Sequence, residues 1–179
     1  RTLRQIAEGG AAAFYEGDAA RAIVAASSEH DGFFEAGDLA RHRSTWVDPI
    51  ATTYRGVEVL ELPPNGQGLA ALQALNILEC FDPAPPTSAL DWHRRIEAVK
   101  LAFADRAAYI ADPEHANVPV EALLDKGYAR RRAASIGERA QGGVAAGLAS
   151  DTTYLCAADE HGNLVSFIQS LFTGFGSGI

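Results

Sequence analysis

The sequence predicts an α+β chain in which a mainly helical region comes first and a β-hairpin follows. Three observations predict it. Apolar residues recur at helical spacing from about Ser88 to Ile110, whereas residues 51–62 and 152–172 alternate as paired strands do. The 179 residues are 47% hydrophobic and 21% charged, a composition typical of one globular domain with a sizeable core.

The region before residue 82 predicts short helices and one strand pair. Glycines break residues 1–43 into short helices, with breaks expected at Gly9-Gly10, Gly17, Gly32 and Gly37. Residues 51–62 predict two strands with a turn near Arg55-Gly56. The segment 66–81 is apolar almost all round, which indicates a buried helix.

A proline-rich break, FDPAPPTS, separates that helix from a longer one. The longer helix is expected from about Ser88 to Asp112-Pro113. Its apolar residues keep the spacing of one helical face: Trp92, Ile96, Val99, Phe103, Ala107 and Ile110. Another helix is expected over roughly 119–139, followed by a run of small residues at 140–150.

The segment from Thr152 predicts a β-hairpin with a specific register. Glu160-His161-Gly162 suits a three-residue loop with Gly162 in the left-handed conformation. That loop places Thr152 opposite Ser170, so that the two hydroxyls lie within reach of each other. A two-residue turn would place Leu171 there instead, on the other face. By alternation, Thr152 shares its face with Tyr154, Cys156 and Ala158.

Charge and hydropathy exclude some classes of function. The net charge of −8 argues against nucleic acid as the main partner, and the basic cluster KGYARRR at 126–132 suits the solvated face of a helix. No apolar run approaches the roughly 20 residues that span a bilayer. The chain contains no Met, which indicates an internal fragment, so the sequence does not determine localisation.

Several other kinds of site find no support. Cys80 and Cys156 make no disulfide framework and are expected to be small buried groups, and no Cys/His spacing resembles a zinc site. The motif GQGLAA at 66–71 fits a dinucleotide-binding pattern. However, Pro63-Pro64-Asn65 separates it from the preceding strand, where that pattern needs a tight turn, so we interpret it as a helix start.

The junction between the small-residue run and the hairpin contains the candidate nucleophile, Thr152. A threonine hydroxyl is a weak nucleophile and needs a base. If the bond before Thr152 is cut, its own α-amino group becomes available, with a pKa of about 7.7–8.0 in model peptides. Ser170 could orient the nucleophile by hydrogen bonding. The alternative is a strand that simply begins with a common β-branched residue.

The residues around this junction resemble the γ-glutamyltranspeptidase family of N-terminal-nucleophile hydrolases. The resemblance covers DTTYLCAADEHGNLVSFIQSLFTGFGSGI and, upstream and in order, FYEG, YRG, LPPNGQGLAALQALNILE and HRRIEAVKLAFADRAAYIADP. It implies a four-layer αββα fold, of which residues 1–151 are large subunit and residues 152–179 begin the small subunit. It further implies autocatalytic cleavage between Asp151 and Thr152, Thr152 as the nucleophile, and Ser170 as the second hydroxyl that hydrogen-bonds it.

The resemblance also implies the partners of the reaction. Those would be a γ-glutamyl amide such as glutathione, with water or an amine as acceptor, and neither a metal nor an organic cofactor. The family's substrate-binding arginine lies upstream of this stretch, and its oxyanion glycines lie downstream.

The sequence departs from the family pattern at three places. Phe172 stands where typical transpeptidases carry an asparagine that recognises the glutamyl group, and Tyr154 stands where many members have histidine. NGQG replaces a loop rich in serine and glycine. Phe172 is therefore a candidate substrate-binding residue, and the variant resembles the branch that includes cephalosporin-acylase-type amidases. Three functions stay open: a γ-glutamyl transferase or hydrolase, a broader amidase, and a homologue that folds but is never processed.

Overall fold

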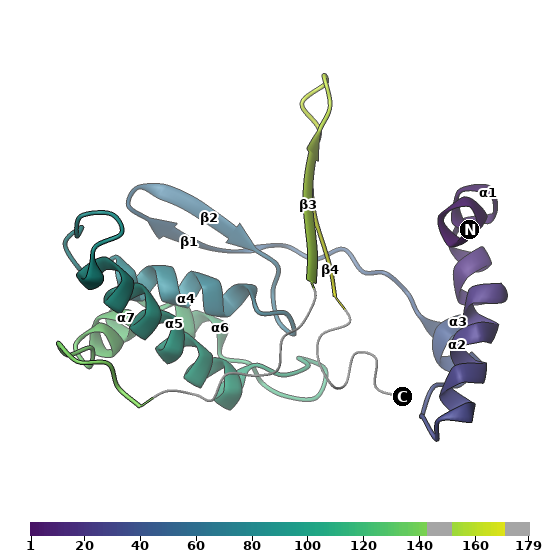
Figure 1. Ribbon diagram of the computed structural model, residues 1–179, viewed down its shortest axis with the longest axis horizontal. Coiled ribbons are helices and arrows are strands. Elements are labelled where there is room, and N and C mark those ends of the chain that lie inside the picture. Colours follow the sequence, from purple (N-terminus) through teal and green to yellow (C-terminus); the bar gives the residue numbers. More distant parts are fainter. Residues whose placement is uncertain (143–151, 171–179) are drawn as a thin grey trace. The chain divides into compact units, whose positions relative to one another are not determined.

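The structure of the chain, a computed structural model, describes residues 1–142 and 152–170 (Figure 1). The chain divides into two units, of which Trp46–Ala145 is one and Arg1–Thr45 with Ala146–Ile179 the other. In these parts of the chain no helix is long and apolar enough to cross a membrane. The same residues contain no cluster of three or more His, Cys, Asp or Glu side chains that could hold a metal ion.

The N-terminal segment forms three helices that contact one another: α1 (Thr2–Tyr15), α2 (Asp18–Glu29) and α3 (Ala36–Arg41). Gly10, at φ 65°, interrupts α1, and Gly17 and Gly32 lie between helices, as predicted. The break predicted at Gly37 is wrong. Glu35 and Asp38 form a reciprocal capping box that starts α3 before this glycine.

In the unit Trp46–Ala145, β1 (Ile50–Tyr54) and β2 (Val57–Glu61) form the antiparallel hairpin that the alternation predicts. Arg55 (φ 50°) and Gly56 (φ 82°) both adopt the left-handed conformation of a two-residue hairpin turn. The predicted turn at Arg55-Gly56 is confirmed.

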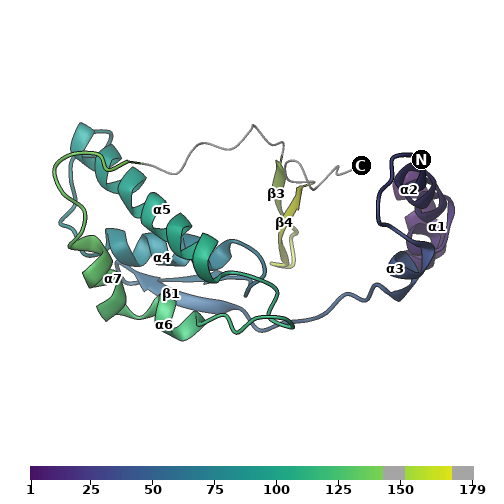
Figure 2. The same ribbon diagram turned by 90° about the horizontal axis from the view of Figure 1, so that it is seen from below.

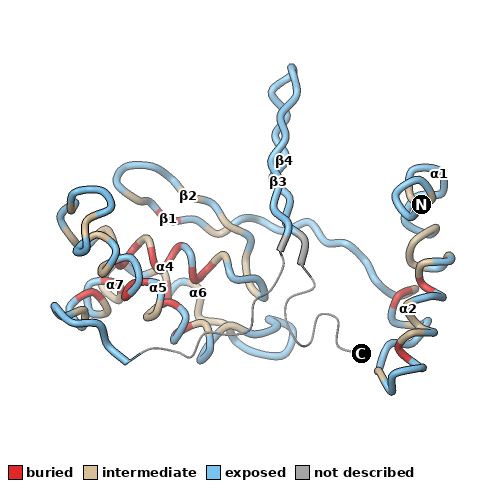
Figure 3. The backbone as a smooth tube through the Cα atoms, viewed as in Figure 1, coloured by how far each residue is buried: buried red, intermediate tan, exposed pale blue. Residues whose placement is uncertain are grey.

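Helix α4 (Gly68–Leu78) is the centre of this unit. It lies between the β1–β2 hairpin and α5 (Ala89–Tyr109), as the two views in Figures 1 and 2 agree. The tube in Figure 3 shows that buried positions gather on α4. Its buried residues are Leu69, Ala70, Leu72, Gln73, Ala74, Asn76 and Ile77. Because neighbours cover it on several sides, the expectation of a buried helix is confirmed.

Helix α5 begins where the Ser88 hydroxyl accepts a hydrogen bond from the Asp91 backbone N–H at 3.1 Å. The predicted long helix is therefore confirmed, but the apolar stripe is not the face that packs on α4. Trp92 and Ile96 are 52% and 54% exposed in this chain, whereas Ala98 and Ala102 are buried. The small alanine side chains let α4 and α5 approach closely.

The single helix expected over 119–139 is instead two short helices, α6 (Val120–Leu124) and α7 (Lys126–Ala133). Asp125 separates them with extended backbone angles, and its side chain accepts a hydrogen bond from the Tyr128 backbone N–H at 2.7 Å. An aspartate that caps a new helix ends the preceding one, and the hydrophobic periodicity did not reveal this break.

A buried carboxylate joins α4, α5 and α7. Asp105, only 4% exposed, accepts hydrogen bonds from Gln73 Nε2 (3.1 Å), the Tyr128 hydroxyl (2.9 Å) and the Arg132 guanidinium (2.7 Å). The expectation that the basic cluster 126–132 is simply a solvated face is thus wrong for Arg132. Burial and the bond to Asp105 raise the pKa of Tyr128, so its hydroxyl stays protonated and donates.

A second cluster of polar side chains, centred on Lys126, holds the β1–β2 hairpin against α4. The Lys126 ammonium donates to the Thr53 carbonyl (2.6 Å), Asn76 Oδ1 (2.7 Å) and Glu79 Oε2 (2.6 Å). Glu79 in turn accepts from the Arg55 backbone N–H at the hairpin turn. The Lys126 hydrogen bond is the main reason that the pKa of Glu79 is lowered, so the Glu79 carboxylate is charged at neutral pH.

The two cysteines are free thiols, and both are exposed, contrary to the expectation of burial. Cys80 follows the last turn of α4, beyond its buried stretch, and Cys156 lies on the strand β3 (Thr152–Ala158).

Candidate active site

The candidate site begins on the hairpin formed by β3 (Thr152–Ala158) and β4 (Leu164–Ser170). The strands are antiparallel, and the paired residues run from Thr152 opposite Ser170 to Ala158 opposite Leu164. The predicted register is therefore confirmed. The distance between the two hydroxyls stays a prediction, and Asp151 and Phe172 lie outside the described residues.

The turn that sets this register is built around one carboxylate. Asp159 accepts hydrogen bonds from the backbone N–H groups of His161 (2.9 Å) and Asn163 (2.8 Å) and from the Asn163 side chain (2.6 Å). Gly162 has φ 84°, the left-handed value expected for the three-residue loop. The bonds from Asn163 are the main reason that the pKa of Asp159 is lowered, so the carboxylate is charged when it holds the turn at neutral pH.

The strands offer no conventional base for the Thr152 hydroxyl. Neither β3 nor β4 contains an Asp, Glu, His, Lys or Arg. On the face that alternation assigns to Thr152, the Tyr154 hydroxyl lies 2.8 Å from Ser166 Oγ, and Cys156 Sγ donates to the Tyr154 oxygen at 3.3 Å. Ser166 lies opposite Cys156, as the same register requires, so its contact with Tyr154 joins the two strands.

Both faces of the hairpin carry large apolar side chains. Tyr154 and Ile168 lie on the Thr152 face, and Leu155 and Phe167 on the other, and all four are at least 45% exposed in this chain. A strand pair that is apolar on both faces is typical of a sheet covered on both sides. This pattern agrees with an internal position in a layered fold.

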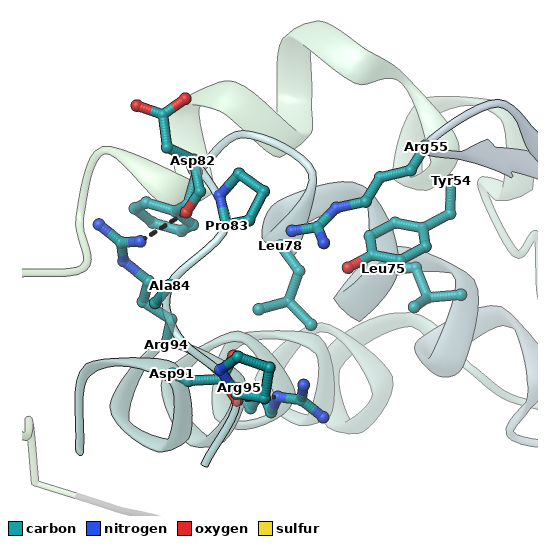
Figure 4. Close-up of a pocket in the computed structure, with 12 residues that line it drawn as sticks. Tyr54, Arg55, Leu75, Leu78, Asp82, Pro83, Ala84, Asp91, Arg94 and Arg95 are labelled. Carbon is teal, nitrogen blue, oxygen red and sulfur yellow. Dashed lines mark hydrogen bonds and ion pairs between the residues drawn. The ribbon is translucent and has the colours of Figure 1, made fainter. Parts of the chain in front are cut away.

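The cavity in Figure 4 does not belong to this candidate site. Its volume is about 500 Å³, and the ends of β1, α4 and α5 line it together with the proline-rich segment after α4. Arg94 donates to the Asp82 carbonyl at 2.8 Å, and Arg95 pairs with Asp91 at 3.0 Å. None of the residues that line it is among those predicted to act in catalysis.

The sequence is similar to those of known proenzymes over nearly its whole length. The chain is 42% identical to the glutathione hydrolase-like YwrD proenzyme of Bacillus subtilis over 99% of its length, and 39% identical to the acylase ACY 1 proenzyme of Pseudomonas sp. strain SE83 over 98%. It covers 34% and 33% of these proteins. The chain thus spans about a third of the length of the relatives it matches.

A solved structure shows the same correspondence. The structure of cephalosporin acylase from Bacillus halodurans superposes with a TM-score of 0.82 and 46% sequence identity, over 99% of this chain and 33% of that one. The expectation of an α+β fragment of this fold is thereby confirmed, as is the resemblance to the acylase-containing branch. The family described as gamma-glutamyltranspeptidase matches residues 1–179, and the chain belongs to the gamma-glutamyltranspeptidase family.

Proposed function

We propose that the full-length protein is a proenzyme that cuts itself between Asp151 and Thr152 and then transfers acyl groups from amides through an ester on Thr152. Residues 1–151 would belong to the large subunit and residues 152–179 would begin the small subunit. The register that pairs Thr152 with Ser170, on strands that supply no other base, carries this proposal. The names of the relatives add support, because both describe proenzymes.

Self-cleavage would begin with the Thr152 hydroxyl. Its oxygen attacks the carbonyl carbon of Asp151, the bond to the Thr152 nitrogen breaks, and that nitrogen takes the proton. Water then hydrolyses the resulting ester, which restores the hydroxyl and leaves a free α-amino group on Thr152.

In turnover, that amino group would act as the general base. It accepts the hydroxyl proton as the oxygen attacks the substrate amide, and returns the proton to the leaving amine. Water or an amine then takes the acyl group from the ester. Ser170, opposite Thr152, would hydrogen-bond the nucleophile and orient it.

The test of this proposal is the mass of the purified full-length protein. We expect two polypeptides, one with Thr152 as its first residue by N-terminal sequencing. An intact single chain that hydrolyses amides would contradict the mechanism. An intact chain without activity would favour the alternative of a homologue that folds but is not processed.

The role of Ser170 leads to a second test. Ser170→Ala removes one hydrogen bond to the nucleophile and should lower kcat by about 2- to 10-fold, the equivalent of about 0.5–1.5 kcal/mol. Ser170→Thr keeps the hydroxyl and should retain activity. Ser166→Ala is a matched control on the same strand and face. Equal losses for the two alanine variants would argue against a specific role of Ser170.

The identity of the acyl group decides which amides the enzyme accepts. We propose γ-glutamyl amides such as glutathione as substrates, with a broader amidase of cephalosporin-acylase type as the second candidate. Phe172 favours the second candidate, because an apolar ring cannot hydrogen-bond the charged groups of a glutamyl head. The identity to proteins named acylase points the same way.

Replacing Phe172 with asparagine tests this choice. We expect the ratio of kcat/KM for a γ-glutamyl anilide to that for a glutaryl anilide to rise about tenfold, the equivalent of about 1.4 kcal/mol. Phe172→Leu controls for loss of the ring without an added amide. A wild type that already strongly prefers the γ-glutamyl substrate, with no gain in the asparagine variant, would rule out the altered-specificity hypothesis.

A further inference from the structure

The cavity in Figure 4 combines an apolar wall with positive charge and lies within the unit Trp46–Ala145. Its volume of about 500 Å³ is in the range of cavities that bind small organic molecules. The apolar wall consists of side chains from α4 and from the proline-rich segment after it: Leu75, Leu78, Phe81, Pro83, Ala84 and Pro86. Three arginines line the same space, Arg55 at the β1–β2 turn and Arg94 and Arg95 on α5.

Two of these arginines lie over aromatic rings at the cavity. The Arg55 guanidinium carbon is 5.1 Å from the centre of the Tyr54 ring, and the Arg94 guanidinium carbon is 4.8 Å from the centre of the Phe81 ring. Stacking of this kind uses the face of the guanidinium group and leaves the N–H donors at its edge available to an anion. Both groups are therefore held in place without using up their donors.

The acids beside the cavity do not neutralise these two arginines. Asp91 pairs with Arg95 at 3.0 Å, and in Figure 4 the Asp82 carboxylate points away from the other labelled side chains. In the described part of the chain, neither Arg55 nor Arg94 forms an ion pair. Both guanidinium groups therefore present an uncompensated positive charge to the cavity.

Most N–H donors of the two arginines are also unused. Arg94 donates to the Asp82 carbonyl at 2.8 Å, and no acceptor among the described residues binds the Arg55 guanidinium. Glu79 senses the Arg55 charge, but its carboxylate is bonded to the Lys126 ammonium and to the Arg55 backbone N–H. A guanidinium group carries several N–H donors in one plane, an arrangement that matches the two oxygens of a carboxylate.

The wall of the cavity is formed before any ligand binds. The proline rings fix the backbone φ angles at Pro83 and Pro86, and the bond from Arg94 to the Asp82 carbonyl ties the segment to α5. Little of the chain must be ordered on binding, so the entropic cost that binding would otherwise carry is reduced.

We propose that this cavity binds a small dicarboxylic acid, with one carboxylate on Arg55, the other on Arg94, and the apolar chain between them on Leu78. Figure 4 shows the two guanidinium groups on opposite sides of Leu78. Two separated cations with an apolar surface between them match a ligand that is anionic at both ends and apolar in the middle. None of these residues acts in the proposed cleavage, so binding is expected whether or not the chain is cut.

Ligands of equal chain length test the proposal on the full-length protein by ligand-observed NMR. Octanedioate carries a carboxylate at both ends, octanoate at one end, and octane-1,8-diol at neither. Octanedioate should bind with a Kd on the order of 0.1–1 mM, as expected for a ligand of its size. Octanoate should bind about tenfold more weakly, because it loses one charge-assisted contact, and the diol more weakly still.

Variants of the cavity locate the site. Arg55→Gln and Arg94→Gln should each lower the preference for octanedioate over octanoate from about tenfold to about twofold or less, because one cation is lost. The preference is compared within each variant, so a general loss of stability does not imitate this result. Arg106→Gln is the matched control, since Arg106 lies 5.7 Å from the Phe103 ring but does not line the cavity. Ala84→Phe keeps every charge, fills part of the cavity and should weaken octanedioate binding about tenfold.

Other results would overturn the proposal. Equal affinity for octanedioate and octanoate in the wild type would do so, as would no binding of either, the result expected if the rest of the polypeptide fills the cavity. A preference that persists in both Arg55→Gln and Arg94→Gln, or binding unchanged by Ala84→Phe, would place the dicarboxylate elsewhere. A preference lost equally in Arg106→Gln would show a general effect of positive charge instead of a site.

Discussion

Replacing Thr152 with alanine is expected to leave the full-length protein as one uncut chain and to lower its kcat by about 10⁴-fold or more, as removal of a covalent nucleophile does in other hydrolases. A methyl group can attack neither the Asp151 carbonyl nor a substrate amide. The measurements are intact mass and the rate of hydrolysis of an anilide substrate.

The adjacent threonine provides the matched control. Thr153 pairs with Gln169, and alternation along β3 assigns it to the opposite face of the hairpin. Thr153→Ala should therefore be cut and remain active, and Thr152→Ser, which retains a hydroxyl, should keep part of both properties. If Thr153→Ala abolished cleavage while Thr152→Ala did not, the nucleophile would be misassigned.

Loss of cleavage and loss of catalysis in Thr152→Ala can also be separated. When the two subunits are produced as separate chains, with the small subunit beginning at residue 152, no self-cleavage is needed. The alanine variant should still be inactive in this form, because the α-amino group then has no hydroxyl to deprotonate. Activity of the alanine variant in this form would show that Thr152 serves processing alone.

The second large effect is expected at the buried ion pair between Arg132 and Asp105. Arg132→Met leaves the Asp105 carboxylate buried without its cation, which should lower the free energy of unfolding by about 3 kcal/mol. That figure is at the lower end for buried pairs, because the Arg132 side chain is 26% exposed and water partly screens it. Urea denaturation of the full-length protein measures it.

A more exposed pair on α5, the helix that carries Asp105, serves as the control for this loss. The Arg95 side chain is 55% exposed and pairs with Asp91. Arg95→Met breaks this pair and should lower the free energy of unfolding by only about 0.3–0.5 kcal/mol. The double variant Arg132→Met with Asp105→Asn removes both charges, while the amide oxygen can still accept from Gln73 and Tyr128, and should recover part of the loss. Equal destabilisation by Arg132→Met and Arg95→Met would contradict the importance of burial.

The sequence by itself determined the local elements and the register at the candidate site. Residue alternation with Glu160-His161-Gly162 predicted that Thr152 pairs with Ser170, because a strand has a period of two and the loop length sets the pairing. The turn at Arg55-Gly56 and the start of α5 at Ser88 were predictable for the same reason: each depends on a few neighbouring residues.

Only the tertiary structure decided which faces pack and which polar residues meet. The apolar stripe of α5 predicted a helix correctly, but the buried residues of α5 are the alanines Ala98 and Ala102 and the acids Glu97 and Asp105. Asp105 pairs with Arg132, which lies 27 positions further along the chain. Glu97 pairs with Lys100, which also donates to the carbonyl of Gln141, 44 positions after Glu97. Sequence periodicity cannot predict such pairs, because they depend on how helices pack in space and not on neighbours along the chain.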